Sequence, residues 1–161
     1  MSSLGACLVD DPETAFYEEL KPISDRFEPE RLRISRLDRN LLIIGGSYPR
    51  DTMQRFAAWI KRVCGGGTPV FVALNAPFDW MFVHWYFIHF LGLDSDPFGF
   101  SAWDAKAYYA GLTKKRLWSE TSGTNIRQDF PTSRPHTHNA VDDCREQADI
   151  FGQMLRKAEA D

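Results

Sequence analysis

The sequence predicts an α/β fold in which helices flank a mixed β-sheet. Two apolar segments near the start are separated by turn residues, which is typical of an antiparallel hairpin. Further along, apolar runs alternate with segments of helical periodicity, which is typical of strands covered by helices. A chain of 161 residues can bury one core, so we expect a single domain over residues 1–161.

The predicted hairpin opens the chain. SLGACLVDD, residues 3–11, is mostly apolar and ends in turn residues, and TAFYEELKPI, residues 14–23, can pair with it. Residues 26–46 show no clear period, so we expect a loop with short helical pieces, closed by Gly45 and Gly46.

Strands and helices alternate in the rest of the chain. From Asp51 onward, apolar residues recur at helical spacing until the glycines at 65–67 end the helix. The apolar run 70–74 predicts a strand covered on both faces, and residues 79–91 predict the next helix. Residues 100–112 predict a short strand leading into a helix, residues 114–138 a polar loop, and residues 140–158 a final helix.

Composition narrows the class of protein. Hydrophobic residues make up 43% and charged residues 25%, values that are typical of a folded globular chain. A net charge of −3 argues against a broad basic face that holds nucleic acid by counterion release. It allows an acidic site that meets phosphate through bound metal ions.

Several features predict a soluble, cytoplasmic protein without a membrane partner. The three cysteines are widely spaced and form no C-x-x-C, which is typical of buried thiols in a reducing compartment. No signal peptide is visible in the first residues. The most apolar window, Trp80–Leu93, is too short to cross a bilayer.

Two acidic positions have the character of site residues. Asp79 follows the predicted strand 70–74, and ligands bind beyond the carboxyl ends of strands in open α/β sheets. Asp143 lies in the first turns of the last helix, and His138 precedes it. Each aspartate alone, like Asp142, can be a helix cap. Together, two carboxylates suit Mg²⁺ ions that act on a phosphodiester, and a nearby histidine can take a proton from water.

These segments resemble a known family. NAPFDWMF, residues 75–82, and HNAVDDCREQA, residues 138–148, resemble the second and third motifs of the DEDDh 3′→5′ exonucleases, which include proofreading subunits, ribonuclease T and oligoribonuclease. The third motif of that family is H-x4-D, and His138 to Asp143 has this spacing. The resemblance covers nearly the whole chain.

The resemblance implies a ribonuclease-H-like fold, which is a mixed sheet flanked by helices. It implies that Asp79 and Asp143 bind a divalent metal, Mg²⁺ or Mn²⁺, and that His138 is the general base; the alternative for His138 is a residue that caps backbone groups. It also implies a single-stranded nucleic-acid 3′ end as substrate, without deciding between RNA and DNA, and it allows a homodimer.

The first motif of the family, D-x-E on the central strand, is not evident. In relatives that strand precedes a segment like SLGACLVD, which here begins at Ser3. The similar string Asp11-Pro12-Glu13 falls on the predicted hairpin turn, where Asp and Pro are favoured for backbone reasons. We therefore expect an N-terminally shortened domain whose first, central strand is missing. Whether Asp11 and Glu13 replace the motif stays open.

Aromatic residues beside Asp79 are candidates for substrate contacts, because bases stack on aromatic side chains. We expect Asn75, Phe78 and Trp80 to contact the substrate, and we assign most other aromatics to the core.

The remaining histidines are not expected to bind metal or take part in catalysis. His84 and His89 are five residues apart on a helix, so they do not share a face as metal ligands would. His136 has the wrong spacing to Asp143, and we assign it to a loop.

Two functions stay open at this point. The first is a metal-dependent 3′→5′ exonuclease that hydrolyses phosphodiester bonds at single-stranded ends, with its activity in doubt because of the missing strand. The alternative is a catalytically inert domain of the same fold that binds nucleic acid or a protein partner. A plain α/β binding domain with a coincidental H-x4-D is a third possibility.

Overall fold

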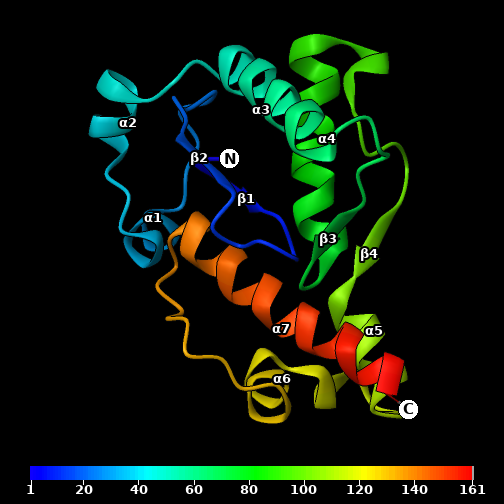
Figure 1. The fold of residues 1–161 in the computed structure, drawn as a ribbon. Coiled ribbons are helices and arrows are strands. Elements are labelled where there is room, and N and C mark those ends of the chain that lie inside the picture. The colour runs from blue at the N-terminus through cyan, green and yellow to red at the C-terminus, as the bar shows by residue number, and fades with distance from the viewer. Residues whose placement is uncertain (161) are drawn as a thin grey trace.

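The computed structural model describes residues 1–160, apart from the Arg31 side chain, and confirms the α/β class (Figure 1). The strands are β1 Ser3–Cys7, β2 Ala15–Glu19, β3 Phe71–Ala73 and β4 Ala102–Asp104. The helices are α1 Pro29–Ser35, α2 Arg39–Gly45, α3 Pro49–Cys64, α4 Ala76–Leu91, α5 Ala105–Leu112, α6 Gly123–Asp129 and α7 Ala140–Ala160. Short 3₁₀ helices, η1 Leu93–Ser95 and η2 Trp118–Thr121, lie between them.

The predicted hairpin is confirmed. Strands β1 and β2 are antiparallel, in a register that runs from Ser3 opposite Glu19 to Cys7 opposite Ala15. The turn between them is fixed at Thr14, whose backbone N–H donates to the Asp11 carbonyl at 3.0 Å. The Thr14 hydroxyl also donates to the Asp11 carboxylate at 2.6 Å. Asp11 therefore stabilises the turn through its carbonyl and its carboxylate, as its position in a turn predicts.

Strands β3 and β4 form the second sheet. They are parallel, from Phe71 opposite Ala102 to Ala73 opposite Asp104, and helix α4 connects them. The strand predicted at 70–74 is therefore shorter than expected, and Val70 is 64% exposed. The reason is the partner, because β4 is itself three residues long and offers nothing further to pair with.

The single mixed sheet that the sequence predicts is not formed within residues 1–160. The strands make two separate two-stranded sheets, with no pairing between β1 and β3 in this part of the chain. One sheet is antiparallel and the other is parallel, so neither is a mixed sheet.

The segment 114–138 corrects the prediction of a polar loop. It contains η2 and α6, and it sends Ile126 and Phe130 into the core at 0% and 5% exposure. A serine begins α6, because the Ser122 hydroxyl accepts from the Asn125 backbone N–H at 3.2 Å. The segment contains few apolar residues, so its pattern did not predict α6. The buried side chains of Ile126 and Phe130 hold this helix against the core.

Two apolar clusters form the core. One packs α3 against α4 and the hairpin, and it contains Met53, Phe56 and Ile60 of α3. The other packs α5 and α6 against α7, where Phe151 is 2% exposed. Within residues 1–160, no helix has both the length and the apolar character needed to span a membrane.

Candidate functional site

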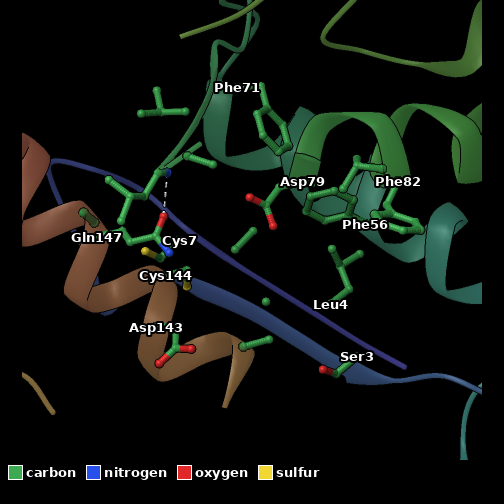
Figure 2. A pocket seen from close by; sticks show the side chains of 18 of the residues that line it. Ser3, Leu4, Cys7, Phe56, Phe71, Asp79, Phe82, Asp143, Cys144 and Gln147 are labelled. Carbon is green, nitrogen blue, oxygen red and sulfur yellow. Dashed lines mark hydrogen bonds between the residues drawn. The ribbon is translucent and has the colours of Figure 1, made fainter. Parts of the chain in front are cut away.

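A cavity of about 670 Å³ lies between β1 and the segment around β3. Helix α4 forms one wall and the start of α7 forms another, as Figure 2 shows. Asp79 lines the cavity from α4, whereas His138 and Asp143 line it from the α7 side. The structure therefore brings the three predicted catalytic and metal-binding residues to one cavity.

Hydrogen bonding ties the two walls together. The backbone N–H of Leu74, at the end of β3, donates to the Gln147 side-chain oxygen on α7 at 2.9 Å (Figure 2). Leu74 directly precedes Asn75, which begins α4. This bond therefore sets the start of α4, and with it Asp79, at a fixed place relative to α7.

Asp79 does not cap its helix. Helix α4 begins three residues earlier than predicted, at Ala76, and Asn75 occupies the N-cap position with φ +67° and no side-chain cap bond. The Asp79 carboxyl reaches solvent, but the cavity walls displace part of its hydration. This desolvation raises the pKa of Asp79 to about 6, although the residue's own backbone N–H favours ionisation.

The start of α7 is capped by Asn139 rather than by an aspartate. The Asn139 side-chain oxygen accepts from the Val141 backbone N–H at 3.0 Å. Asp142 accepts from the Thr137 hydroxyl at 2.8 Å, and Asp143 accepts from the His138 backbone N–H at 3.1 Å. Both aspartates therefore hold the loop before the helix.

His138 stands on that loop in a left-handed conformation, with φ +63°. Such a backbone costs a non-glycine residue about 1–2 kcal/mol, although histidine tolerates it better than most. The bond from its backbone N–H to Asp143 helps to maintain the turn. The side chain remains exposed, where it can meet water and a ligand.

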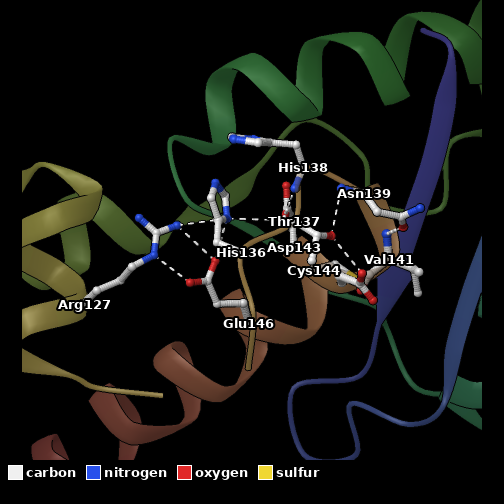
Figure 3. Close-up of polar contacts among 10 residues, drawn as sticks. Arg127, His136, Thr137, His138, Asn139, Val141, Asp143, Cys144 and Glu146 are labelled. Atoms are coloured by element: carbon white, nitrogen blue, oxygen red, sulfur yellow. Dashed lines mark hydrogen bonds and ion pairs between the residues drawn. The ribbon is translucent and has the colours of Figure 1, made fainter. Parts of the chain in front are cut away.

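A buried ion pair lies behind the loop (Figure 3). Glu146 is 2% exposed and accepts two bonds from the Arg127 guanidinium, at 2.6 and 3.0 Å. Burial opposes the ionisation of Glu146, but Arg127 and His136 outweigh it and hold the pKa of this carboxyl below its ordinary value. Glu146 is therefore a charged residue in a buried place.

His136 connects this pair to the cavity. Its Nδ1 lies 2.8 Å from the Glu146 carboxylate and 3.2 Å from the Asp143 carboxylate, with the Arg127 guanidinium at 3.1 Å. The two carboxylates favour a proton on Nδ1, which leaves the lone pair on Nε2. A carboxylate that receives one ring N–H is the usual support of a metal-binding histidine.

The ligand atoms of His136, His138 and Asp143 lie within 4.8 Å of one another. Asp79 is not part of this cluster, so the two aspartates predicted as metal ligands line one cavity from separate walls. His136, which the sequence assigns to a loop, is in a loop but joins the cluster.

The predicted substrate residues are in different places. Phe78 lines the cavity at 58% exposure and packs edge-on against Phe82, with ring centroids 5.2 Å apart. Asn75 begins α4 and does not line the cavity. Trp80 stacks on His84 at 4.4 Å, also outside the cavity lining. Substrate contact by these residues stays a prediction.

The other α4 histidines have structural neighbours. His84 contacts the Asp96 carboxylate through Nδ1, and His89 stacks on Trp85 at 4.4 Å. Neither histidine lines the cavity.

The residues that sequence reasoning missed are Arg127, His136 and Glu146. One signal could have found Glu146, because it lies three residues after Asp143 and thus on the same face of α7. Arg127 comes from a segment predicted as loop, so no periodic pattern indicated it.

No protein-family model matches the chain. A 3′-5′ DNA exonuclease of Escherichia coli, Cap18, is 37% identical over 152 residues, which covers 94% of this chain and 80% of that protein. The chain therefore belongs to the family of 3′-5′ exonucleases that this relative represents.

Proposed function

We propose that the chain is a metal-dependent 3′→5′ exonuclease of the DEDDh type that acts on single-stranded DNA ends. The observation that carries this proposal is the placement of Asp79, His138 and Asp143 on one cavity. Family membership supports the reaction, and the name of the Escherichia coli relative supports DNA over RNA as substrate.

The donor groups of the cavity fit a divalent ion. Asp79 and Asp143 offer carboxylate oxygens, which Mg²⁺ and Mn²⁺ prefer. His136 adds an imidazole nitrogen beside Asp143, and imidazole suits transition metals better than Mg²⁺. We therefore expect Mn²⁺ to support more activity than Mg²⁺. A bound ion supplies charge stabilisation at phosphate and lowers the pKa of its water.

The chain's own residues have distinct roles in this proposal. His138, exposed at the cavity, takes the proton of the attacking water on a ring nitrogen. Asp143 holds the turn that presents His138, through the bond to its backbone N–H. Phe78 offers an exposed ring on which a terminal base can stack.

The family's D-x-E strand would have a place in this structure. The cavity is bordered by β1, which pairs with β2, and by β3, which pairs with β4, so both strands present an edge toward it. A strand between them would pair on both sides and bring two carboxylates between Asp79 and Asp143. We propose that the full carboxylate set requires such a strand. A peptide with D-x-E between apolar residues, added in trans, should then raise the rate.

The same open edges could instead pair with a second copy of the chain, because exposed strand edges favour association. Light scattering at several protein concentrations tests the proposed homodimer. A monomer mass throughout would contradict it.

The decisive assay follows the shortening of a 5′-labelled single-stranded DNA and of its RNA equivalent, with Mg²⁺ or Mn²⁺. We expect stepwise shortening of DNA that disappears in Asp143→Asn. Glu13→Gln is the matched control, because Glu13 pairs with Arg134 at 3.0 Å on the hairpin turn and does not line the cavity. Loss of activity in Glu13→Gln would make Asp11 and Glu13 the working first motif.

A second candidate function is an inert domain that binds single strands. It is favoured by the positions of Asp11 and Glu13, which are engaged on the turn with Thr14 and Arg134 rather than at the cavity. Under this alternative, fluorescence anisotropy should give equal DNA affinity with EDTA and with Mn²⁺. Tighter binding with Mn²⁺ alone would count for the exonuclease.

A further inference from the structure

Two thiols meet at the base of the cavity. Cys7 is on β1 and Cys144 is on α7, and both line the cavity (Figure 2). Figure 2 shows the two side chains beside each other. Both are half-buried, so solvent and small oxidants can reach them through the cavity. The third cysteine, Cys64, ends α3 on another wall.

The close approach follows from how β1 runs along α7. A Cβ on Gly5 would lie 2.3 Å from the Ala140 carbonyl group, so only glycine allows the two backbones to come this near. Two residues further along β1 is Cys7, on the same face of the strand, about 7 Å away. Four residues further along α7 is Cys144, on the same face of the helix, about 6 Å away. Both steps start at the Gly5–Ala140 contact and are nearly equal in length, so they bring Cys7 next to Cys144.

The contact continues along both elements. Val9, the next residue on that face of the chain, lies 3.9 Å from the position that a Cβ on Gly152 would take. The two thiols therefore lie between two contacts of the chain with α7, the close approach of Gly5 to Ala140 before them and the van der Waals contact of Val9 with Gly152 after them. Two neighbouring thiols on elements packed in this way are candidates for a disulfide.

We propose that Cys7 and Cys144 are a redox modification site, which a peroxide converts to a reversible disulfide that lowers the nuclease activity. The effect on activity rests on the proposed function, whereas the formation of the disulfide does not. In reducing compartments, disulfides are generally transient and redox-sensing, which fits a reversible bond.

The chemistry balances with hydrogen peroxide as the oxidant. One thiol is oxidised to a sulfenic acid, Cys–SOH, while the peroxide is reduced to water. The second thiol attacks the sulfenic sulfur, the S–S bond forms, and a second water leaves. A dithiol such as dithiothreitol reverses the step by thiol–disulfide exchange and becomes oxidised itself.

The disulfide would act on the site through Asp143, the residue before Cys144. An S–S bond is about 2.0 Å long, shorter than any nonbonded contact between two sulfurs. Closure therefore turns the two side chains toward each other and ties the first turns of α7 to β1. The tie restrains Asp143, and with it the bond that holds the His138 turn.

The test uses the whole chain, reduced and desalted, then treated with hydrogen peroxide and alkylated. Peptide mapping by mass spectrometry should find the Cys7 and Cys144 peptides joined, in the wild type and in Cys64→Ser. Cys7→Ser and Cys144→Ser should not form this link, with circular dichroism as the check on their fold. The linked protein should melt at a higher temperature, because the bond closes a long loop in the unfolded chain.

The outcomes are distinct. A joined peptide that dithiothreitol separates, with reversible loss of most DNA shortening in Cys64→Ser, supports the proposal. No joined peptide, or a link that includes Cys64, overturns it. A joined peptide with unchanged activity overturns the regulatory part. If the reduced protein shortens no DNA at all, the proposed function fails, while mapping and melting still decide whether the disulfide forms.

Discussion

On the α4 wall of the cavity, Asp79 has no side-chain partner within residues 1–160, and desolvation raises its pKa to about 6. On the α7 wall, Asp143 lies in a network with His136 and the His138 backbone. Glu146 and Arg127 anchor that network from within the core. The Asp79 carboxyl therefore has no cation of the described chain beside it, whereas Asp143 is held by groups of the fold.

The two walls differ in whether the charge of their aspartate stabilises the fold. An unpaired, partly desolvated carboxylate weakens the fold when it is charged, and such carboxylates cluster at functional sites. A carboxylate that bonds a turn and a histidine can be retained for structure alone. Substitutions on each wall distinguish these two situations.

Asp79→Asn should lower the rate of DNA shortening about 1000-fold, since a lost metal contact is worth several kcal/mol at the transition state. Asp143→Asn should lose a similar amount, so both walls would be equal in chemistry. Asp51→Asn, on the exposed face of α3, is the control and should keep full activity. Near-normal turnover in Asp79→Asn would remove the α4 wall from the site.

Arg127→Met should lower the free energy of unfolding by about 3 kcal/mol, because it leaves the Glu146 charge buried without its main partner. The control is Arg33→Ala, which breaks an exposed ion pair with Glu30 and should cost under about 0.5 kcal/mol. Urea unfolding measures both.

The pH dependence of the Arg127 effect has a defined sign. The pKa of Glu146 is held below its ordinary value in the folded protein, so the stability from its ionised form is present above about pH 4.5. It is lost as the pH falls through the folded pKa. The two proteins should therefore converge in acid, and a constant difference down to low pH would contradict the assigned ion pair.

Gly5→Ala should destabilise the fold by about 2 kcal/mol, since the added methyl would overlap the Ala140 backbone and push β1 away from α7. Gly45→Ala is the matched control, because nothing lies within 4 Å of its Cβ position at the end of α2. Thermal melting distinguishes them. Equal melting temperatures would show that β1 and α7 are not in close contact.

The smallest effect concerns Asp79 and has the opposite sign to its catalytic effect. Between pH 3.8 and about 6 the folded protein keeps a proton that the unfolded chain has lost. Ionised Asp79 therefore costs stability above about pH 6 and not below about pH 4. After allowance for solvent screening, Asp79→Asn should stabilise the metal-free protein by about 1 kcal/mol or less at pH 7.5.

Melting curves at pH 7.5 and at pH 4 test this last prediction. The gain should vanish at the lower pH, where the wild-type carboxyl is also neutral. A destabilised Asp79→Asn at pH 7.5 would mean that the charge has a partner in the fold, and the two walls would then be alike.

Local sequence determined most elements and one half of the site. The hairpin, α3, the start of β4 and α7 follow from alternation, helical periodicity and turn residues, which act over a few neighbours. The spacing from His138 to Asp143 similarly placed both residues at the start of α7. Asp79 was located by the end of an apolar run, although its helix begins earlier than its pattern indicated.

Other features depend on contacts between segments that are distant in the sequence, and no local pattern contains these contacts. The pairing partners of β1 and β3 depend on which strands are available, so one predicted sheet became two within residues 1–160. The Arg127–Glu146 pair joins a short, weakly patterned helix to α7, and it brings His136 to Asp143. The contact of Cys7 with Cys144 depends on a glycine that lets a strand approach a helix. These are contacts between distant segments, set by packing and backbone approach rather than by periodicity.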